Sequence, residues 1–247
     1  MVQLATRERV DAFWSSTLGI DAADLHMPGV RVRINPPERN SWRGVYILTF
    51  DKSACVFAPE DLLAPIQAAT ADLDADAVLE HDTWQQILGD QIHLMFGPVV
   101  HHYRDDLTGM EPDPDARRIN PRDADALTAL RGSVPWEEWA SAGFTAQPAM
   151  LFGIFEDDRL LAAANLTNGP DASSDVGLVL HPDARGKGYG VRIAGAAARQ
   201  ALLLHGVARF RALASSAPTM AIAARLGFTE YGRNLAVYLK GGDLLRI

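Results

Sequence analysis

The chain has 247 residues, enough for one large domain or two small ones. Hydrophobic residues make up 48% and charged residues 22%, as in globular proteins that bury a substantial core. The net charge of -8 argues against broad binding to nucleic acid or to an anionic membrane surface, although a local basic site can still bind phosphate.

Cysteine content and apolar runs bear on the cellular compartment. Cys55 is the single cysteine, so the chain forms no internal disulfide and a reducing compartment suits it. It lies in an apolar run, which favours a buried thiol over a nucleophile. The N-terminal residues lack an apolar signal core, and no apolar run approaches the about 20 residues of a membrane helix. We therefore predict a cytoplasmic protein.

Residues 1–103 have the pattern of a small α/β region. Hydrophobic spacing and turn residues predict helices over 6–18, 62–69 and 82–89, and strands over 30–34, 44–50, 54–57, 91–96 and 99–103. Gly97-Pro98 separates the last two strands. His101 and His102 are adjacent and would face opposite sides of a strand, so no metal site is predicted there or elsewhere.

A polar stretch rich in Asp and Pro, residues 104–115, separates two parts of the chain. We interpret it as a solvated linker. After it the pattern predicts strand, two helices, hairpin, central strand, glycine-rich turn, helix, strand, helix and strand. These elements are expected at 116–119, 120–130, 135–140, 150–155, 160–166, 176–180, 191–204, 207–214, 215–226 and 231–239.

The glycine-rich turn is Arg-Gly-Lys-Gly-Tyr-Gly at residues 185–190. Its alternate glycines let the backbone bend and its N–H groups face a common point, and the following helix adds free N–H donors and a positive dipole end. Arg185 and Lys187 add positive charge at the rim. Such a turn suits phosphate, with an ordinary turn as the alternative. Its spacing disfavours a nucleotide-triphosphate loop or a dinucleotide fingerprint.

Three segments resemble the GNAT family of N-acetyltransferases: His181-Pro182, the turn at 185–190, and Ala-Ile-Ala-Ala-Arg-Leu-Gly-Phe at 221–228. The resemblance implies an α/β (α+β) domain over 116–247, with a central mixed, mostly antiparallel sheet flanked by helices. Residues 1–103 would be an added, smaller α/β region, with a degenerate copy of the same fold as one interpretation.

The resemblance also implies acetyl-CoA as co-substrate. Main-chain groups of Leu178, Val179 and Leu180 would pair with pantetheine as an added strand would. The pyrophosphate would lie at the turn formed by Arg185, Gly186, Lys187, Gly188, Tyr189 and Gly190. Tyr189 is expected to pack on the domain and take no part in the chemistry.

The implied reaction is direct attack of a primary amine of an unknown acceptor on the thioester. The amine must be neutral, so a base or a water chain is needed. Asp175 is a candidate base, with a turn-capping role as the alternative. Many family members have a Tyr as general acid, but Ala223 stands at that position here. Ser216 or a water could replace it, or no acid is required. Glu137 and Glu138 either bind an amino group or are solvated.

Two other functions stay open at this point. The residue Ala223 motivates a non-catalytic acyl-CoA-binding module that controls partner contacts through residues 1–103. A second alternative is transfer of a longer acyl group. The predicted partners are acetyl-CoA and an amine, without nucleic acid or membrane, and the oligomeric state is left between a monomer and a homodimer.

Overall fold

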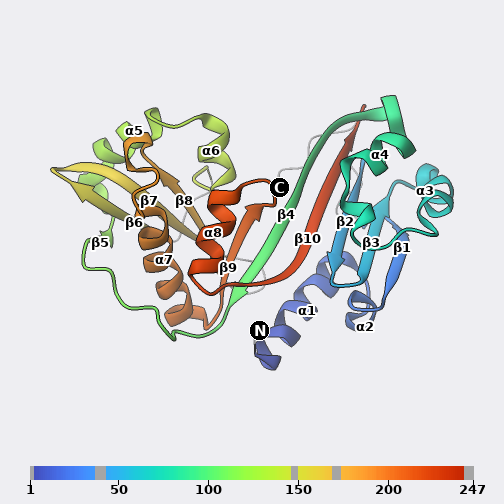
Figure 1. The fold of residues 1–247 in the computed structure, drawn as a ribbon, viewed down its shortest axis with the longest axis horizontal. Coiled ribbons are helices and arrows are strands. Elements are labelled where there is room, and N and C mark those ends of the chain that lie inside the picture. Colours follow the sequence, from blue (N-terminus) through green and yellow to red (C-terminus); the bar gives the residue numbers. More distant parts are fainter. Residues whose placement is uncertain (1–2, 37–42, 146–149, 169–173, 242–247) are drawn as a thin grey trace. The chain divides into compact units, whose positions relative to one another are not determined.

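The structure is a computed structural model that describes residues 3–36, 43–145, 150–168 and 174–241. The chain folds into two compact units (Figure 1). Unit 1 comprises residues 1–6, 102–211 and 217–229, and unit 2 comprises residues 7–101, 212–216 and 230–247.

Unit 2 contains most of the N-terminal half of the chain and the last strand. Its elements are α1 (Leu4–Leu18, which begins in unit 1), α2 (Ala22–Leu25), β1 (Gly29–Ile34), β2 (Gly44–Phe50), β3 (Ser53–Ala58), α3 (Leu63–Thr70), α4 (His81–Leu88), β4 (Ile92–Arg104, which ends in unit 1) and β10 (Thr229–Leu239, which begins in unit 1). The strand order is β1-β3-β2-β10-β4. The β1–β3 pair is parallel, whereas β2 pairs antiparallel with both β3 and β10.

Strand β4 corrects one expectation from the sequence. Two strands at 91–96 and 99–103 were expected, but a single strand runs through Gly97-Pro98. A Cβ at Gly97 would lie 2.7 Å from the carbonyl oxygen of Asn234 in β10. The missing side chain therefore lets the two backbones approach closely and keeps the strand continuous.

The apolar core of unit 2 lies between its strands and the helices α3 and α4. Alternate residues of β2, such as Val45 and Ile47, are fully buried there together with Ile66 of α3 and Trp84 of α4. The indole N–H of Trp84 donates to the carbonyl oxygen of Val78 at 2.8 Å, so the buried ring keeps a polar partner.

Unit 1 contains the predicted turn and the helix that follows it. Its elements are β5 (Ala116–Arg118), α5 (Ala124–Gly132), α6 (Trp136–Ser141), β6 (Met150–Glu156), β7 (Arg159–Asn168), β8 (Ser174–Leu180), α7 (Tyr189–His205), β9 (Ala208–Leu213, which ends in unit 2) and α8 (Ala217–Arg225). The order is β9-β8-β7-β6-β5, with three antiparallel pairs from β5 to β8 and a parallel β8–β9 pair.

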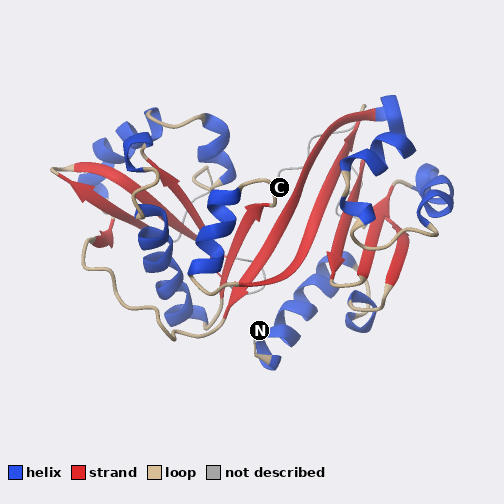
Figure 2. Ribbon diagram, viewed as in Figure 1, coloured by secondary structure: helices blue, strands red, loops and turns tan. Residues whose placement is uncertain are grey.

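Helices cover both faces of the unit 1 strands (Figure 2). Val179 of β8 packs with Leu130 of α5 and Trp139 of α6 in one core cluster. Leu180, the next residue, points to the other face and contacts the position of Gly190 in α7. This is the alternation expected of a central strand. The mixed, mostly antiparallel sheet with flanking helices confirms the predicted fold class.

The last strand pairs with an early one. Residues 233–238 of β10 pair with residues 44–49 of β2. The described residues of this last segment, 230–241, therefore lie in the same compact unit as residues 7–101. The domain boundaries 1–103, 104–115 and 116–247 stay a prediction.

Candidate active site

The turn between β8 and α7 is exposed and is built around two left-handed glycines. A short 3-10 turn, Pro182–Ala184, follows His181, and the chain then bends at Gly186 (φ +74°) and Gly188 (φ +84°). Gly188 is the N-cap of α7. Residues 185–188 are exposed, and a Cβ on either glycine would meet open space. The free N–H groups of the first turn of α7 therefore adjoin a surface on which an anion can lie.

Gly190 has a different role from the two glycines of the bend. It is buried in the first turn of α7, and a Cβ there would lie 2.8 Å from Cδ1 of Ile222 in α8 and 3.5 Å from Cδ1 of Leu180. The small residue therefore lets α7 pack against α8 and β8. This packing accounts for a glycine at position 190 even when no ligand is considered.

The charged side chains around the turn already have partners. Arg185 contacts Glu138 of α6, with its Nη2 atom 2.8 Å from Oε2. Lys187 is exposed and forms no hydrogen bond or ion pair with the described residues. Asp183 pairs with Arg159 at 2.6 Å, and this hydrogen bond holds the pKa of the Asp183 carboxyl below its ordinary value. Of the two cationic residues predicted at the rim of the turn, Lys187 is the one that can meet a phosphate without first giving up an ion pair.

His181 fixes the start of the turn. Its Nδ1 accepts the N–H of Asp183 at 3.1 Å, while Arg159 contacts the ring. The ring thus caps the short 3-10 turn as a local polar side chain does. This agrees with the expectation that His181 shapes the turn.

Arg192 in the first turns of α7 is a charged residue that the sequence did not single out. Its Nε lies 2.7 Å from Asp113, and its Nη2 also contacts Asp115. The hydrogen bond from Arg192 lowers the pKa of the Asp113 carboxyl. Asp113 is only 16% exposed, so the predicted linker is anchored to α7 and is not simply a solvated connector.

Strand β8 loses its partner β9 partway along its length. The parallel register joins residues 174–176 of β8 to residues 208–210 of β9, and in the described chain it ends at Val176 and Phe210. The antiparallel register with β7 continues to Leu180. As far as the described residues show, positions 177–180 are therefore paired along one edge only, with β7.

The hydrogen-bond pattern shows which main-chain groups point to this edge. The N–H of His181 donates to the carbonyl oxygen of Leu161 in the antiparallel ladder, at 2.8 Å. Hydrogen-bonded and non-hydrogen-bonded residue pairs alternate along antiparallel strands. The main-chain groups of odd-numbered β8 residues therefore bond to β7, and those of even-numbered residues point away from β7. Ser174 follows this rule, since its N–H donates to Val207 before β9. The N–H and C=O groups of Leu178 and Leu180 therefore point to the edge that β9 has left.

The end of α6 packs against this part of β8 through Asn165. The buried Asn165 side chain donates to the carbonyl oxygen of Ala142 at 2.8 Å and accepts the N–H of Gly177 at 3.2 Å. A Cβ at Gly177 would lie 1.9 Å from that Ala142 oxygen. Gly177 is therefore needed for close approach of α6 to the strand, next to the unpaired edge.

Asp175, a predicted catalytic residue, lies in an ion-pair cluster with β9. Its Oδ1 is 2.5 Å from Nε of Arg209, and its Oδ2 accepts from Nη2 of Arg209 at 3.0 Å and lies 3.4 Å from Arg211. Arg209 is 7% exposed and Asp175 16%. Both carboxylate oxygens thus face guanidinium groups, which favours a structural role over proton abstraction.

Ser216 and Ala223 are the two positions considered for the general acid. Ser216 lies in unit 2, in the turn that precedes α8, where its N–H donates to Leu213 at 2.9 Å. Ala223, at the position of the usual tyrosine, is fully buried in α8. It has no group that can donate a proton, so a general acid would have to come from elsewhere.

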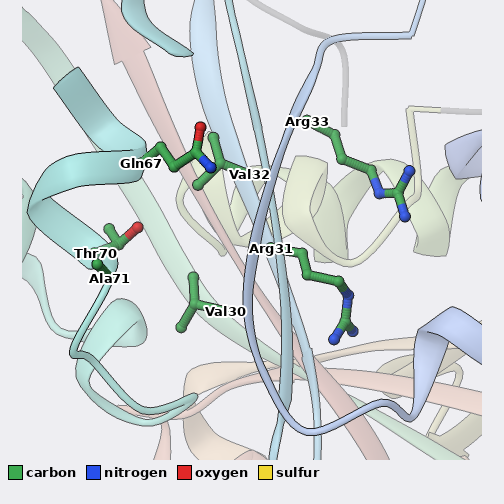
Figure 3. A pocket seen from close by; sticks show the side chains of 7 residues that line it. All are labelled: Val30, Arg31, Val32, Arg33, Gln67, Thr70 and Ala71. Carbon is green, nitrogen blue, oxygen red and sulfur yellow. The ribbon is translucent and has the colours of Figure 1, made fainter. Parts of the chain in front are cut away.

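Unit 2 has a pocket between β1 and α3 (Figure 3). Val30 and Val32 point into it toward Gln67 and Thr70, while Arg31 and Arg33 point to the opposite side of the strand. The Thr70 hydroxyl donates to the carbonyl oxygen of Ile66 at 2.9 Å. The two charged residues that line the pocket thus turn their side chains away from Gln67 and Thr70, and none of the lining residues belongs to the predicted turn.

Two further residue classes gave no sign of a site. Cys55 is fully buried in β3, as expected, and this burial raises the pKa of its thiol. Among the described residues, no group of three or more His, Cys, Asp or Glu side chains is placed to hold a metal ion.

No helix in the described ranges combines the length and apolar character needed to cross a membrane.

Comparison with known sequences adds to this geometry. Residues 104–228, about half of the 247 residues, match the acetyltransferase (GNAT) family. The chain belongs to this family. It is therefore an acyltransferase by family, and the GNAT match includes β8, the glycine turn and α7. No curated protein matches the chain.

Solved GNAT structures resemble part of the chain. A GNAT acetyltransferase from Novosphingobium aromaticivorans is 18% identical, with 60% of this chain and 67% of that chain covered and a TM-score of 0.48. One from Colwellia psychrerythraea is 16% identical, with 64% and 61% covered and a TM-score of 0.48. One from Kribbella flavida is 19% identical, with 62% of each covered and a TM-score of 0.44. The match thus spans less than two thirds of the last two proteins.

Proposed function

We propose that this protein is an acetyl-CoA-dependent N-acetyltransferase that acetylates a primary amine. One observation carries the proposal: β8 leaves β9 after Val176 and then runs, with an open main-chain edge, into the exposed turn at the start of α7. The family membership agrees with this interpretation.

The open edge suits pantetheine, which is extended and carries two amides. The outward N–H and C=O groups of Leu180 and the C=O group of Leu178 can pair with these amides as an added strand would, which leaves the N–H of Leu178 free for the thioester. Val179, whose main-chain groups face β7, then contributes its buried side chain to the core and not to the ligand. Of the three strand residues predicted to bind the co-substrate, the proposal thus keeps two as hydrogen-bonding residues.

The turn suits the pyrophosphate. Gly186 and Gly188 keep the surface open, and the N–H groups at the start of α7 can donate to phosphate oxygens. Lys187 adds a point charge. Tyr189 and Gly190 bind no phosphate in this proposal: the Tyr189 ring lies 5.5 Å from the guanidinium carbon of Arg192 in the same helix, and Gly190 packs against Ile222.

The chemistry is direct attack. The neutral amine nitrogen bonds to the thioester carbon, the C–S bond breaks, and the amine proton passes to solvent or a base. The outward N–H of Leu178 is the donor we assign to the developing oxyanion, because Gly177 already gives its N–H to Asn165. A thiol of pKa about 8.5 leaves as thiolate with modest help, so a dedicated acid is not essential.

The base and acid assignments follow from the side-chain partners. We propose that Asp175 holds β8 and β9 together through Arg209, and that a water chain removes the amine proton in its place. Ser216 remains the proposed donor if one is required. We further propose that the protein acts in the cytoplasm.

Turnover tests the proposal. Purified protein is mixed with acetyl-CoA and a library of primary amines, and released thiol is measured with a disulfide reagent. We expect turnover with at least one amine and an acetylated product by mass spectrometry. CoA binding without turnover would instead support a non-catalytic acyl-CoA-binding module, the alternative that Ala223 motivated. Mass spectrometry of the bound ligand separates acetyl from longer acyl groups.

A further inference from the structure

Arg185 is engaged with Glu138, although its place in the turn suits phosphate. Its Nη2 atom lies 2.8 Å from Oε2 and 3.1 Å from Oε1 of Glu138, so one guanidinium nitrogen serves both carboxylate oxygens. The side chains are 48% and 36% exposed. The contact joins the glycine turn to α6, two elements 47 residues apart in sequence.

The Arg185–Glu138 ion pair costs little free energy to break, so Arg185 can exchange Glu138 for another anion. Exposed pairs of this kind change an equilibrium constant by about fivefold at most. A diphosphate carries more charge than a carboxylate and offers several oxygens to the planar fork of an arginine. A diphosphate bound at the turn therefore competes well for the Arg185 guanidinium.

We propose that Arg185 is shared between Glu138 and the diphosphate of the acyl-CoA, so that Glu138 sets the affinity for the co-substrate. The inference rests on the proposed function and assigns Glu138 a role that neither the family nor the turn defines. In the free protein Glu138 holds Arg185. When the acyl-CoA is bound, Arg185 contacts its diphosphate, and the Glu138 carboxylate on α6 is released from the ion pair.

A simpler explanation must be separated from exchange. Glu138 is a negative charge near the turn and would repel phosphate even if Arg185 were absent. Repulsion predicts that removing the Glu138 charge strengthens binding in any background. Exchange predicts that it does so only while Arg185 is present, which is the coupling that a double-mutant cycle measures.

Calorimetry with coenzyme A as the probe tests the inference on the full chain. The variants are Glu138→Gln, Arg185→Ala and the double variant. Glu137→Gln is the matched control, because Glu137 is exposed on the same helix and the described structure gives it no ion pair. Circular dichroism confirms that each variant folds, as expected for exposed side chains.

We expect Glu138→Gln to lower the Kd for coenzyme A about threefold and Arg185→Ala to raise it about tenfold, with Glu137→Gln unchanged. The double variant should match Arg185→Ala. Tighter binding after Glu138→Gln in both backgrounds, or no effect of Arg185→Ala, overturns the inference and leaves the proposed function intact. Absence of binding by the wild type overturns the proposed function itself.

Discussion

The side-chain oxygen of Asn165 lies 3.2 Å from the backbone nitrogen of Gly177, directly across the β7–β8 pair. The same side chain donates to the carbonyl oxygen of Ala142 at the end of α6. One buried amide therefore fixes the helix and the strand together at the point where β8 separates from β9.

Replacing Asn165 by Ala should destabilise the protein by about 1–3 kcal/mol, because the buried Asn165 amide makes hydrogen bonds to Ala142 and Gly177 that are lost. Urea unfolding measures the change. Thr167→Ala is the control, since Thr167 is on the same strand but less buried. An Asn165→Ala variant as stable as this control would show that the amide does not hold α6.

Gly177→Ala should cost about 2–4 kcal/mol, since its Cβ would clash with the backbone of Ala142, which cannot move aside as a side chain can. The same substitution at Gly132 of α5 should stabilise by about 0.5–1 kcal/mol, because that site has open space and helical geometry. Thermal unfolding compares the two. Equal effects at both sites would contradict the close approach of α6 to β8.

Asp175→Asn separates a structural role from a catalytic one. Loss of the carboxylate removes the ion pair with the buried Arg209 and should lower stability by about 2 kcal/mol. If Asp175 is structural, kcat at saturating acetyl-CoA changes less than about threefold and the pH–rate profile keeps its acidic limb. A fall of a hundredfold or more with loss of that limb would identify Asp175 as the base.

Asp113 links the acidic stretch to α7 in a pH-dependent way. Its hydrogen bonds from Arg192 lower the carboxyl pKa in the folded protein. A lowered folded-state pKa stabilises the fold above the unfolded value of about 3.9, and this contribution is lost as the pH falls through the folded value. Asp113→Asn should therefore cost about 1 kcal/mol at pH 7. The difference from wild type should shrink below about pH 4. A difference that is constant from pH 7 to pH 3 would contradict this assignment.

The sequence predicted those parts of the fold that local signals determine. The strand at 176–180, the glycine bend and the helix after it appear as β8, the turn and α7, because glycine conformations and apolar spacing act within a few residues. The sequence treated the three alternate glycines alike, whereas only Gly186 and Gly188 have a left-handed backbone and Gly190 is buried in the helix.

Long-range features escaped prediction. The Asp175–Arg209 pair depends on the parallel register of two strands 34 residues apart, and the Arg185–Glu138 contact joins a turn to a distant helix. The close approach at Gly177 and the continuity of β4 through Gly97 likewise depend on which backbone lies opposite. No local pattern carries that information.

The central claim is that the turn before α7 binds the co-substrate through its pyrophosphate, and acetyl-CoA calorimetry tests it most directly. Gly188→Asp places a negative side chain on the open surface at the N-terminus of α7, and Gly206→Asp is the matched control, since Gly206 caps the other end with the same left-handed φ and open space. We predict that Gly188→Asp weakens binding at least about thirtyfold and that Gly206→Asp leaves it unchanged. Equal binding by wild type and Gly188→Asp would contradict the claim.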